Sequence, residues 1–396
     1  MISNLHIGFD ARHLTSKVLR GMDRYTVGLI SELVNQGVQV TLFHRACEPL
    51  NSIHIKNLKC NIIGLKDYSG LHWEQVVLPL ALLRGKFDLF HAPAERGVPL
   101  FAPCPVVFTI HSVTGNSYYN LVQSGLLPGC VSDYLGYDFN PSRNSFWDYL
   151  FRLQLLRANY IITPSDFCRS EVIRFLNVHP NRVITTHLAA HEQFEKPARP
   201  KDERDTLLKT LGIKKPYLLY VGGYEPHKNV AGLLETFAIV KQTHPDLMLV
   251  IAGSKFLPES LRQKALALNL HTDDVLFLVD VTDELTDLYD SAELFVTLSW
   301  RETFCLPALE AMKRGVPVIG SQWGAFSEVA GDAGQVINPN DYTGTASTIL
   351  QMLKPEKRMS LSDLACQQAR KFNWERTGKE TLNLYKSLLG LTDKHS

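Results

Sequence analysis

Residues 294–320 read LFVTLSWRETFCLPALEAMKRGVPVIG and contain a short apolar run, a polar turn, a helical pattern and a second apolar run. The runs LFVTL and VPVIG do not alternate polar and apolar residues, which is typical of parallel strands covered by helices on both faces. Pro307 suits the first position of a helix, and Gly315 suits its end. The stretch therefore predicts a strand ending near Ser299, a helix from Pro307 to about Arg314 and a second strand.

Similar apolar runs recur along the whole chain, with helical patterns such as NVAGLLETFAIVKQ between them. A chain of 396 residues is also too long for a single hydrophobic core. The sequence therefore predicts an α/β fold with two Rossmann-like doubly wound domains. The further runs are LHIGFD, VQVTLFH, NIIGL, FDLFHAP, VVFTIH, YIITPS and RVITTH in the first half, and YLLYVGG, LMLVIAG and VLFLV in the second.

A segment rich in proline and charge, EKPARPKDERD, separates the two halves. Because it has few apolar residues, it predicts a linker from about Glu195 to Asp205. The first domain is accordingly expected over residues 1–195, and the second begins at residue 196.

A long excursion, from about Thr114 to Leu150, follows the run that ends at His111. Long loops at the carboxyl ends of strands often carry specificity. Two interpretations stay open: a specificity loop, or a surface flap that buries itself with its own aromatic side chains. These aromatic residues are Tyr118, Tyr119, Tyr134, Tyr137, Phe139, Trp147 and Tyr149.

The composition excludes several classes of protein. Apolar residues make up 45% of the chain and charged residues 20%, as in ordinary globular proteins, and the net charge of +1 gives no reason to expect nucleic acid as a partner. The seven cysteines form no CxxC pair, and we find neither a secretory leader nor an apolar run long enough to span a membrane. We expect a protein of the reducing cytoplasm, and peripheral association with the inner face of a membrane stays open.

The turn before Pro307 predicts a phosphate site. Backbone N–H groups of Phe304, Cys305 and Leu306 lie at the expected helix N-terminus, where partial positive charge accumulates. Glu302 lies just outside this position and Glu310 on the following turns. Two carboxylates about a phosphate site suit a nucleotide-sugar, whose diphosphate lies between hydroxyl-bearing sugars. The simpler interpretation is one capping carboxylate and one solvated helical glutamate.

The motif ETFCLPALE, the following EAMKRGVPVI and Glu328 in SEVAGDAGQVINPND resemble the retaining glycosyltransferases of family 4, which have the GT-B fold. The resemblance extends over nearly the whole chain, through IGFDARHL, RGMDRYT, HWEQVVLPLAL, FDLFHAP, PCPVVFTIH, YIITPSDF and FNWERTGKETLNLY. It implies two domains facing each other across a cleft, with the acceptor on residues 1–195 and the nucleotide-sugar on residues 196–373. A last helix from about Trp374 to Leu389, within residues 374–396, is implied to return to the first domain.

The resemblance also implies roles for the residues of the second domain. Glu302 would contact the transferred sugar and Glu310 the ribose, while the backbone around Phe304 to Leu306 would contact sugar and phosphate. Thr303 and Cys305 replace usual glycines, which suggests a tighter sugar pocket. In YVGGYEPHKN, Lys228 matches the lysine that neutralises the leaving diphosphate. Gly223 and His227 stand where arginine is common, and Arg301 is one candidate to supply the missing charge.

Three further positions follow from the resemblance. Gly21 would let the backbone approach the phosphate, His111 would face the sugar, and Val281, with Asp280, would hold the nucleobase through main-chain groups. Gly21 and His111 also have plain structural interpretations, as a helix-entry turn and a hydrogen-bonded turn residue. The chain has no Asp-x-Asp motif, and HLAAH, residues 187–191, lacks the glutamate of HExxH, so we expect neither a metal nor another cofactor.

The function implied is transfer of a sugar from a GDP- or UDP-sugar, GDP-mannose among them, to a glycan or glycolipid acceptor in the synthesis of cell-surface polysaccharide or lipopolysaccharide. The acceptor hydroxyl would attack on the face from which the nucleotide leaves. An oxidoreductase is disfavoured because the first βα turn has no GxGxxG. A catalytically silent glycosyltransferase-like subunit, which binds a glycan or a partner enzyme, is the remaining alternative.

Overall fold

A computed structural model of the chain describes residues 5–16, 21–51, 55–56, 58–94, 96–127, 129–135, 146–214, 216–253 and 256–391. Tyr137 and Phe139 of the aromatic excursion lie outside these residues. The chain divides into two compact units. The first consists of Met1–Ser117, Asn140–Ala189 and Phe372–Ser396, and the second of Tyr118–Phe139 and Ala190–Lys371.

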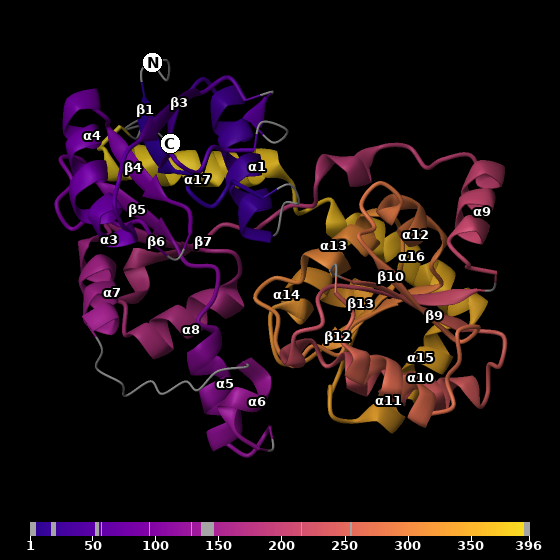
Figure 1. Ribbon diagram of the computed structural model, residues 1–396. Helices are drawn as coiled ribbons and strands as arrows, with labels where there is room; N and C mark the ends of the chain where they lie inside the picture. The colour runs from indigo at the N-terminus through magenta and orange to yellow at the C-terminus, as the bar shows by residue number, and fades with distance from the viewer. Residues whose placement is uncertain are drawn as a thin grey trace. The chain divides into compact units, whose positions relative to one another are not determined.

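The first unit contains a parallel seven-stranded sheet in the order β3-β2-β1-β4-β5-β6-β7 (Figure 1). The direction in which strands are added reverses between β1 and β4, which pair directly in the register Gly8 to Phe90. Burial explains the unbroken apolar runs, because β4 and β5 are buried at every position. The strands are β1 (His6–Asp10), β2 (Gln39–Arg45), β3 (Asn61–Leu65), β4 (Leu89–Ala92), β5 (Val106–Thr109), β6 (Tyr160–Thr163) and β7 (Val183–Thr185).

The helices of the first unit connect these parallel strands. α3, η1 and α4 follow one another without a break, and α5 begins in the first unit and ends in the second. The helices are α1 (Gly21–Asn35), α3 (Gly70–His72), the π-helix η1 (Trp73–Val77), α4 (Leu78–Gly85), α5 (Thr114–Gln123), α7 (Phe146–Arg157), α8 (Asp166–Leu176), the 3₁₀ turn η2 (Pro180–Arg182) and α17 (Trp374–Leu388).

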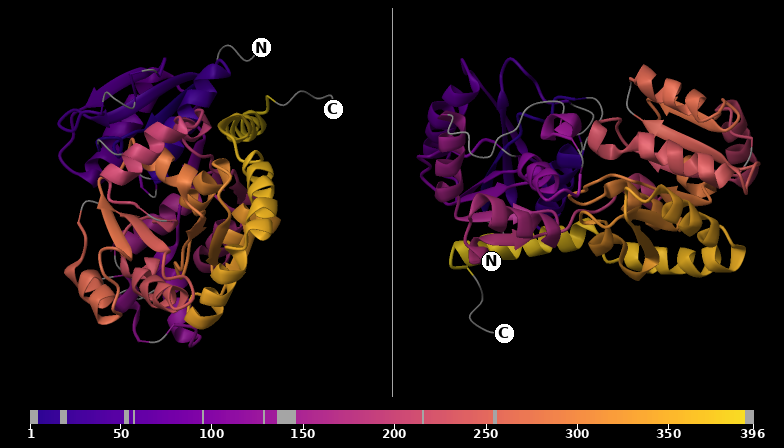
Figure 2. Two further views of the ribbon diagram at one scale, coloured as in Figure 1. Left: turned by 90° about the vertical axis from the view of Figure 1, so that its right-hand side faces the viewer. Right: turned by 90° about the horizontal axis from the view of Figure 1, so that it is seen from below.

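The second unit contains a parallel six-stranded sheet in the order β10-β9-β8-β11-β12-β13, with its own reversal between β8 and β11. Its main core lies where α10 and α15 cover the sheet, with Phe237 and Ile349 fully buried. Helices flank the sheet on both sides in Figure 2. The strands are β8 (Tyr217–Val221), β9 (Met248–Gly253), β10 (Val275–Val279), β11 (Leu294–Val296), β12 (Val318–Ser321) and β13 (Gly334–Ile337).

The helices of the second unit include short 3₁₀ turns beside the strand ends. They are α6 (Val131–Leu135), η3 (Glu192–Glu195), α9 (Lys201–Thr210), η4 (Pro226–Lys228), α10 (Val230–Lys241), α11 (Glu259–Ala267), α12 (Leu285–Ser291), α13 (Leu306–Lys313), α14 (Phe326–Ala330), η5 (Gly331–Ala333), α15 (Tyr342–Met352) and α16 (Pro355–Ala369). Among the described residues no helix is both long enough and apolar enough to cross a bilayer.

The predicted α/β fold with two doubly wound domains is confirmed, and every apolar run named above contains a strand. The pattern missed β13, in which the first and last residues are buried and the two between them are partly or fully exposed. The predicted helix at Pro307 begins one residue earlier, at Leu306, and Gly315 ends it with φ +72°.

Two expectations were wrong. The predicted linker at 195–205 runs into α9, which begins at Lys201 because Asp202 and Glu203 suit a first turn and Leu208 is buried. The excursion at 114–150 contains α5, α6 and the start of α7 in place of a single loop. The part of the excursion that begins at Tyr118 and ends before Asn140 belongs to the second unit, outside the first domain expected for it, because Tyr118 and Tyr134 pack against Trp300 and Trp323.

The last helix, α17, packs against α1 in the first unit (Figures 1 and 2). A Cβ added to Gly28 of α1 would lie 2.5 Å from the indole of Trp374. The hydroxyl of Tyr385 lies 2.6 Å from Nδ1 of His91 on β4, and Nε2 of His91 lies 2.7 Å from the hydroxyl of Thr109. Close helix packing and one buried polar chain therefore hold α17 to the sheet.

We expect Gly28→Ala to lower the free energy of unfolding by about 1–3 kcal/mol, because the new methyl group overlaps the Trp374 ring. Urea unfolding would measure the loss. Gly70→Ala is the matched control, since a Cβ there meets nothing within 4 Å. Equal stability of the two variants would contradict this packing.

Candidate functional site

The second sheet places a candidate site at the reversal of its strand order. In doubly wound sheets, ligands bind beyond the carboxyl ends of the strands at this point. Residues 222–228 follow β8, and residues 297–302 follow β11, which pairs with β8. The two segments that contain Lys228 and Glu302 are therefore brought together by the topology of the sheet.

Lys228 and Glu302 form an ion pair, with Nζ of Lys228 2.9 Å from Oε1 of Glu302. Burial alone would raise the pKa of Glu302, but the ammonium of Lys228 outweighs burial and holds the pKa below its ordinary value. Burial alone would likewise lower the pKa of Lys228, and the carboxylate of Glu302 raises it instead. Both groups are thus charged at neutral pH, and their side chains keep 22% and 15% of their surface exposed, so a ligand can reach them.

The 3₁₀ turn η4 holds His227 and Lys228 in place. The carbonyl of His227 accepts a hydrogen bond from the backbone N–H of Trp300, 3.0 Å away. Asn229 follows in the left-handed conformation, with φ +51°, and its side chain both accepts from the N–H of Gly232 and donates to the carbonyl of Pro339. Asn229 was not predicted from the sequence, although asparagine before a helical pattern signals an N-cap.

His227 contributes no positive charge to the site. Burial, followed by the neighbouring Lys228, lowers the pKa of His227 to about 4, so the imidazole is neutral at pH 7. At Gly223 an added Cβ would lie 2.0 Å from a carboxylate oxygen of Glu225, so a carboxylate covers the position at which the family resemblance expects arginine. Lys228 is therefore the cation placed against Glu302.

The turn into α13 has a strained conformation at Cys305. This residue has φ +73° and ψ +57°, the left-handed region in which glycine is favoured, and it is buried. Burial, with the nearby Glu302, raises the pKa of the Cys305 thiol, which stays protonated. Thr303 is half-buried, Phe304 is buried, and Leu306 begins α13, so backbone N–H groups lie at the helix N-terminus as predicted.

A second turn supports the backbone of Glu302 from behind. The N–H of Ala325 donates to the carbonyl of Glu302 at 2.8 Å. A Cβ on Gly324 would lie 2.6 Å from the backbone nitrogen and oxygen of Glu302, so only glycine allows this approach. Glu328 lies on the short helix α14 that follows.

Glu310 lies on α13 and is buried. The hydroxyl of Tyr289, on α12, donates to Oε2 of Glu310 at 3.2 Å. Glu302, Lys228 and Glu310 all act electrostatically on the thiol of Cys305, which places the three charged groups around this residue. The structure thus refutes the interpretation of Glu310 as a solvated helical glutamate.

An aromatic cluster stands beside the ion pair, and the sequence analysis did not assign it to the site. The ring of Tyr118 lies 5.9 Å from that of His227, and the ring of Tyr134 packs edge-on against Trp300 at 4.8 Å. Nε1 of Trp300 donates to Asn340 at 2.8 Å. The excursion after β5 therefore packs against His227 and Trp300, the neighbours of the ion pair in the second unit.

Val281 lies apart from this group within the second unit. It follows β10, two strands from β8 in the sheet, and Asp280 before it has φ +56°. It nevertheless shares the carboxyl edge of the sheet with Lys228, because all six strands are parallel.

The first unit contains the other two predicted positions. His111 follows β5, and its Nε2 donates to the carbonyl of Pro93 at 2.8 Å. Burial lowers its pKa to about 4, so the ring is neutral. Gly21 is the first, exposed residue of α1. The first unit also contains a charged network that was not predicted from the sequence, in which Arg12 pairs with Asp10 at 2.7 Å and Glu74 at 3.1 Å.

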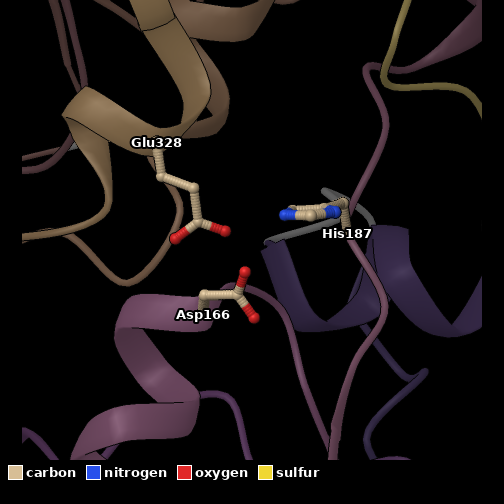
Figure 3. Close-up of side chains that lie close together, drawn as sticks. All are labelled: Asp166, His187 and Glu328. Carbon is tan, nitrogen blue, oxygen red and sulfur yellow. The ribbon is translucent and has the colours of Figure 1, made fainter.

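The HLAAH segment is not helical, so its histidines do not share a helix face. Figure 3 shows His187 beyond the end of β7 and Asp166 in the first turn of α8, both in the first unit. Oδ1 of Asp166 accepts a hydrogen bond from the hydroxyl of Thr185 at 2.5 Å. The carboxylate is thus used within the unit's own structure.

We expect the free energy of unfolding of the Cys305→Gly variant to be about 1 kcal/mol higher than that of the Cys305→Ala variant. Both changes delete the thiol, and only glycine relieves the left-handed backbone. Chemical denaturation of the two variants measures the difference. A more stable alanine variant would show that residue 305 does not hold this conformation.

We expect His227 to remain neutral in the free protein down to about pH 5, because burial opposes its protonation. In the unfolded chain it takes up a proton below pH 6.5, so stability falls as the pH drops from 6.5 toward 4, by up to about 1.4 kcal/mol per pH unit from this residue. An NMR titration, with the resonance assigned through His227→Gln, measures the pKa. A midpoint near 6.5 would contradict the expectation.

In a comparison with known proteins, a glycosyltransferase family model matches each half of the chain. The model described as "Glycosyltransferase Family 4" matches residues 19–190, and the model described as "Glycosyl transferases group 1" matches residues 203–368. Together they cover most of the described residues of both units.

Relatives of known name extend the comparison. The chain is 36% identical over 234 residues to O-antigen chain mannosyltransferase B of Escherichia coli, covering 58% of this chain and 61% of that relative, so it spans less than two thirds of the relative's length. It is 23% identical over 398 residues to D-inositol 3-phosphate glycosyltransferase of Corynebacterium efficiens, and this match covers 92% of this chain and 90% of that relative. The crystal structure of Anabaena HepE with UDP and glucose matches with a TM-score of 0.74 at 16% identity, over 97% of this chain and all of that one, and shows the shared fold.

Proposed function

Because the chain belongs to the family 4 glycosyltransferases with the GT-B fold, we propose that it is a hexosyltransferase of the cytoplasm. It moves a sugar from a nucleoside diphosphate to a glycan or glycolipid acceptor in the synthesis of cell-surface polysaccharide, with retention of the anomeric configuration. The relative named O-antigen chain mannosyltransferase B supports mannose as the transferred sugar. We therefore propose GDP-mannose as the first candidate donor. The structure of HepE with UDP supports a nucleotide as the carrier and makes a UDP-sugar the other candidate.

The observation that carries the proposal is the Lys228–Glu302 ion pair beside the N-terminus of α13. A carboxylate and an ammonium at the reversal point of a doubly wound sheet suit a ligand with hydroxyls and negative charge close together. In the proposed complex the diphosphate takes the place of Glu302 at the ammonium of Lys228. Glu302 then accepts hydrogen bonds from the hydroxyls of the transferred sugar, and the backbone N–H groups near Leu306 bind phosphate oxygen.

The proposed reaction needs positioning and charge stabilisation from the protein. As the bond between the sugar carbon and the phosphate oxygen breaks, negative charge grows on the leaving diphosphate, and Lys228 neutralises it. The acceptor hydroxyl attacks the same carbon from the leaving-group side, and its proton passes to the departing phosphate oxygen. Neutral His227 beside Lys228 cannot share this charge in the free protein, whereas the guanidinium of the buried Arg301, whose charge also acts on His227, is the second candidate cation.

Glu310 is proposed to hold the ribose. Its carboxylate is already oriented by the hydroxyl of Tyr289, and it lies on the helix whose first turn is proposed to bind phosphate. A ribose hydroxyl would donate to the remaining lone pairs of the carboxylate.

We expect Lys228→Met to lower kcat about 100-fold or more, since removing one stabilising charge from a developing anion costs roughly 3 kcal/mol. Single-turnover hydrolysis or transfer from a radiolabelled nucleotide-sugar measures the rate. The matched control is Lys241→Met, which breaks the Lys241–Asp274 pair elsewhere in the same unit. Full turnover by a folded Lys228→Met protein would refute the assignment.

We expect Glu310→Gln to weaken binding of the nucleoside diphosphate about tenfold, because a charged acceptor of the ribose hydroxyls becomes neutral. The amide oxygen can still accept from Tyr289, so the fold is preserved. Equilibrium dialysis measures the affinity, and the control is Glu235→Gln on α10, where the wild-type carboxylate pairs with Lys264 of α11. Equal affinity in the two variants would remove the ribose assignment.

A silent subunit is the second candidate, and the structure offers one observation in its favour. The carboxylate of Glu225 covers Gly223, where the resemblance expects a cation for the diphosphate. A protein of this kind would bind glycan or a partner enzyme and would bind no nucleoside diphosphate.

A further inference from the structure

A groove of about 500 Å³ lies on the first unit between the edge strand β3 and helix α4, whose positions Figure 1 labels. The apolar side chains that line it include Phe43, Phe87, Ile63 and Leu80, and Lys66 and Arg84 are its charged residues. None of these residues belongs to the sites described above. A volume of this size is typical of sites for small molecules or single hydrocarbon chains.

The groove is apolar and open. β3 is the outer strand of the sheet, and Asn61 to Gly64 are all exposed, so its apolar side chains lack the helical cover that the other strands have. Ile63 is 40% exposed and Leu80 45%. Exposed apolar side chains gathered on an edge strand mark a surface that another molecule covers.

The floor of the groove is preformed. The rings of Phe43 and Phe87 meet edge-on at 5.4 Å, and both residues are buried. A Cβ added to Gly85, at the end of α4, would lie 2.3 Å from the ring of Phe87, so the helix end passes over the ring only because residue 85 is glycine. A ligand therefore meets a packed aromatic surface that needs no rearrangement.

The charge at the groove is positive. Lys66 and Arg84 are exposed, and within the described part of the chain neither pairs with a carboxylate. The carboxylate next in sequence, Asp67, is taken by Arg45 at 2.7 Å. Two cations beside an apolar groove complement an anionic amphiphile.

The same charges disfavour a second copy of this chain as the occupant. A two-fold interface places the same patch of both copies face to face, so Lys66 and Arg84 would meet their own equivalents. Like charges at an interface are unfavourable.

We propose that this groove takes a hydrocarbon chain of an anionic lipid and holds the first unit to a lipid surface. The chain lies on Phe43 and Phe87 between Ile63 and Leu80, and the phosphate of the headgroup pairs with Lys66 and Arg84. One inserted chain binds only reversibly, and basic residues at the headgroup level supply the second signal that stable attachment needs.

The test is sedimentation of the full-length protein with vesicles of equal parts phosphatidylglycerol and phosphatidylcholine, and with vesicles of phosphatidylcholine alone. We expect binding to the anionic vesicles and little to the neutral ones. Ile63→Glu should lower the partition coefficient by about tenfold or more, because a carboxylate enters the groove. Its control is Ile62→Glu, equally exposed on the same strand but pointing to the opposite face.

Arg84→Glu tests the charge at the groove. Reversing one charge near an anionic surface should lower the partition coefficient by roughly 25-fold. Lys357→Glu makes the same change of net charge at an exposed position on α16 of the second unit, and it should leave binding nearly unchanged. Circular dichroism of each variant shows whether it has folded.

Three results would overturn the proposal: no binding to anionic vesicles, equal binding to neutral ones, or equal losses in Ile62→Glu and Ile63→Glu. Sedimentation velocity tests whether a second copy of the chain occupies the groove instead. If the protein binds no vesicles but forms a dimer, and Ile63→Glu dissociates that dimer, the groove is a dimer interface. Vesicle binding requires neither donor nor turnover, so its failure leaves the proposed transferase function untouched.

Discussion

The ion pair between Lys228 and Glu302 is the interaction on which the candidate site of this protein depends. Its partners lie 74 residues apart in the chain, and they meet because β8 and β11 are neighbours at the reversal of the sheet. The pair keeps both groups charged despite their burial, since each offsets the desolvation of the other. A sugar diphosphate can take the place of each partner, because its phosphate can pair with the ammonium of Lys228 and its hydroxyls can donate to the carboxylate of Glu302.

The surroundings of the pair explain how this chain departs from the usual pattern of its family. Where the resemblance expects additional positive charge, the structure has a carboxylate over Gly223 and a neutral imidazole at His227. Where it expects a glycine, Cys305 holds a left-handed conformation and is buried among charged groups. Proposed catalysis by this chain therefore relies on the ammonium of Lys228, on the nearby buried Arg301 and on backbone N–H groups held in a strained turn.

Much of the fold was readable from the sequence because buried parallel strands leave unbroken apolar runs, and proline and glycine mark the ends of α13. The short strand β13 was missed because half of its residues are partly exposed. For the site, the motif around Glu302 and the lysine at 228 were identified, but their pairing is a property of the sheet order. The contribution of Tyr118 could not be foreseen, because it arises from a chain segment that leaves the first unit to pack on Trp300 and Trp323 of the second. The burial that makes His227 neutral is likewise a property of the folded chain.

The proposed nucleotide-sugar site is best tested by titration calorimetry of the free protein with GDP, UDP, ADP and their sugar conjugates in the presence of EDTA. We expect micromolar binding that is selective for one base, persists without divalent metal and is weakened by loss of the Lys228 ammonium. Such a result would also name the donor for a search among acceptors. Failure of all of these ligands to bind would contradict a nucleotide-sugar site at the ion pair and would leave a silent, glycan-binding subunit as the function of this fold.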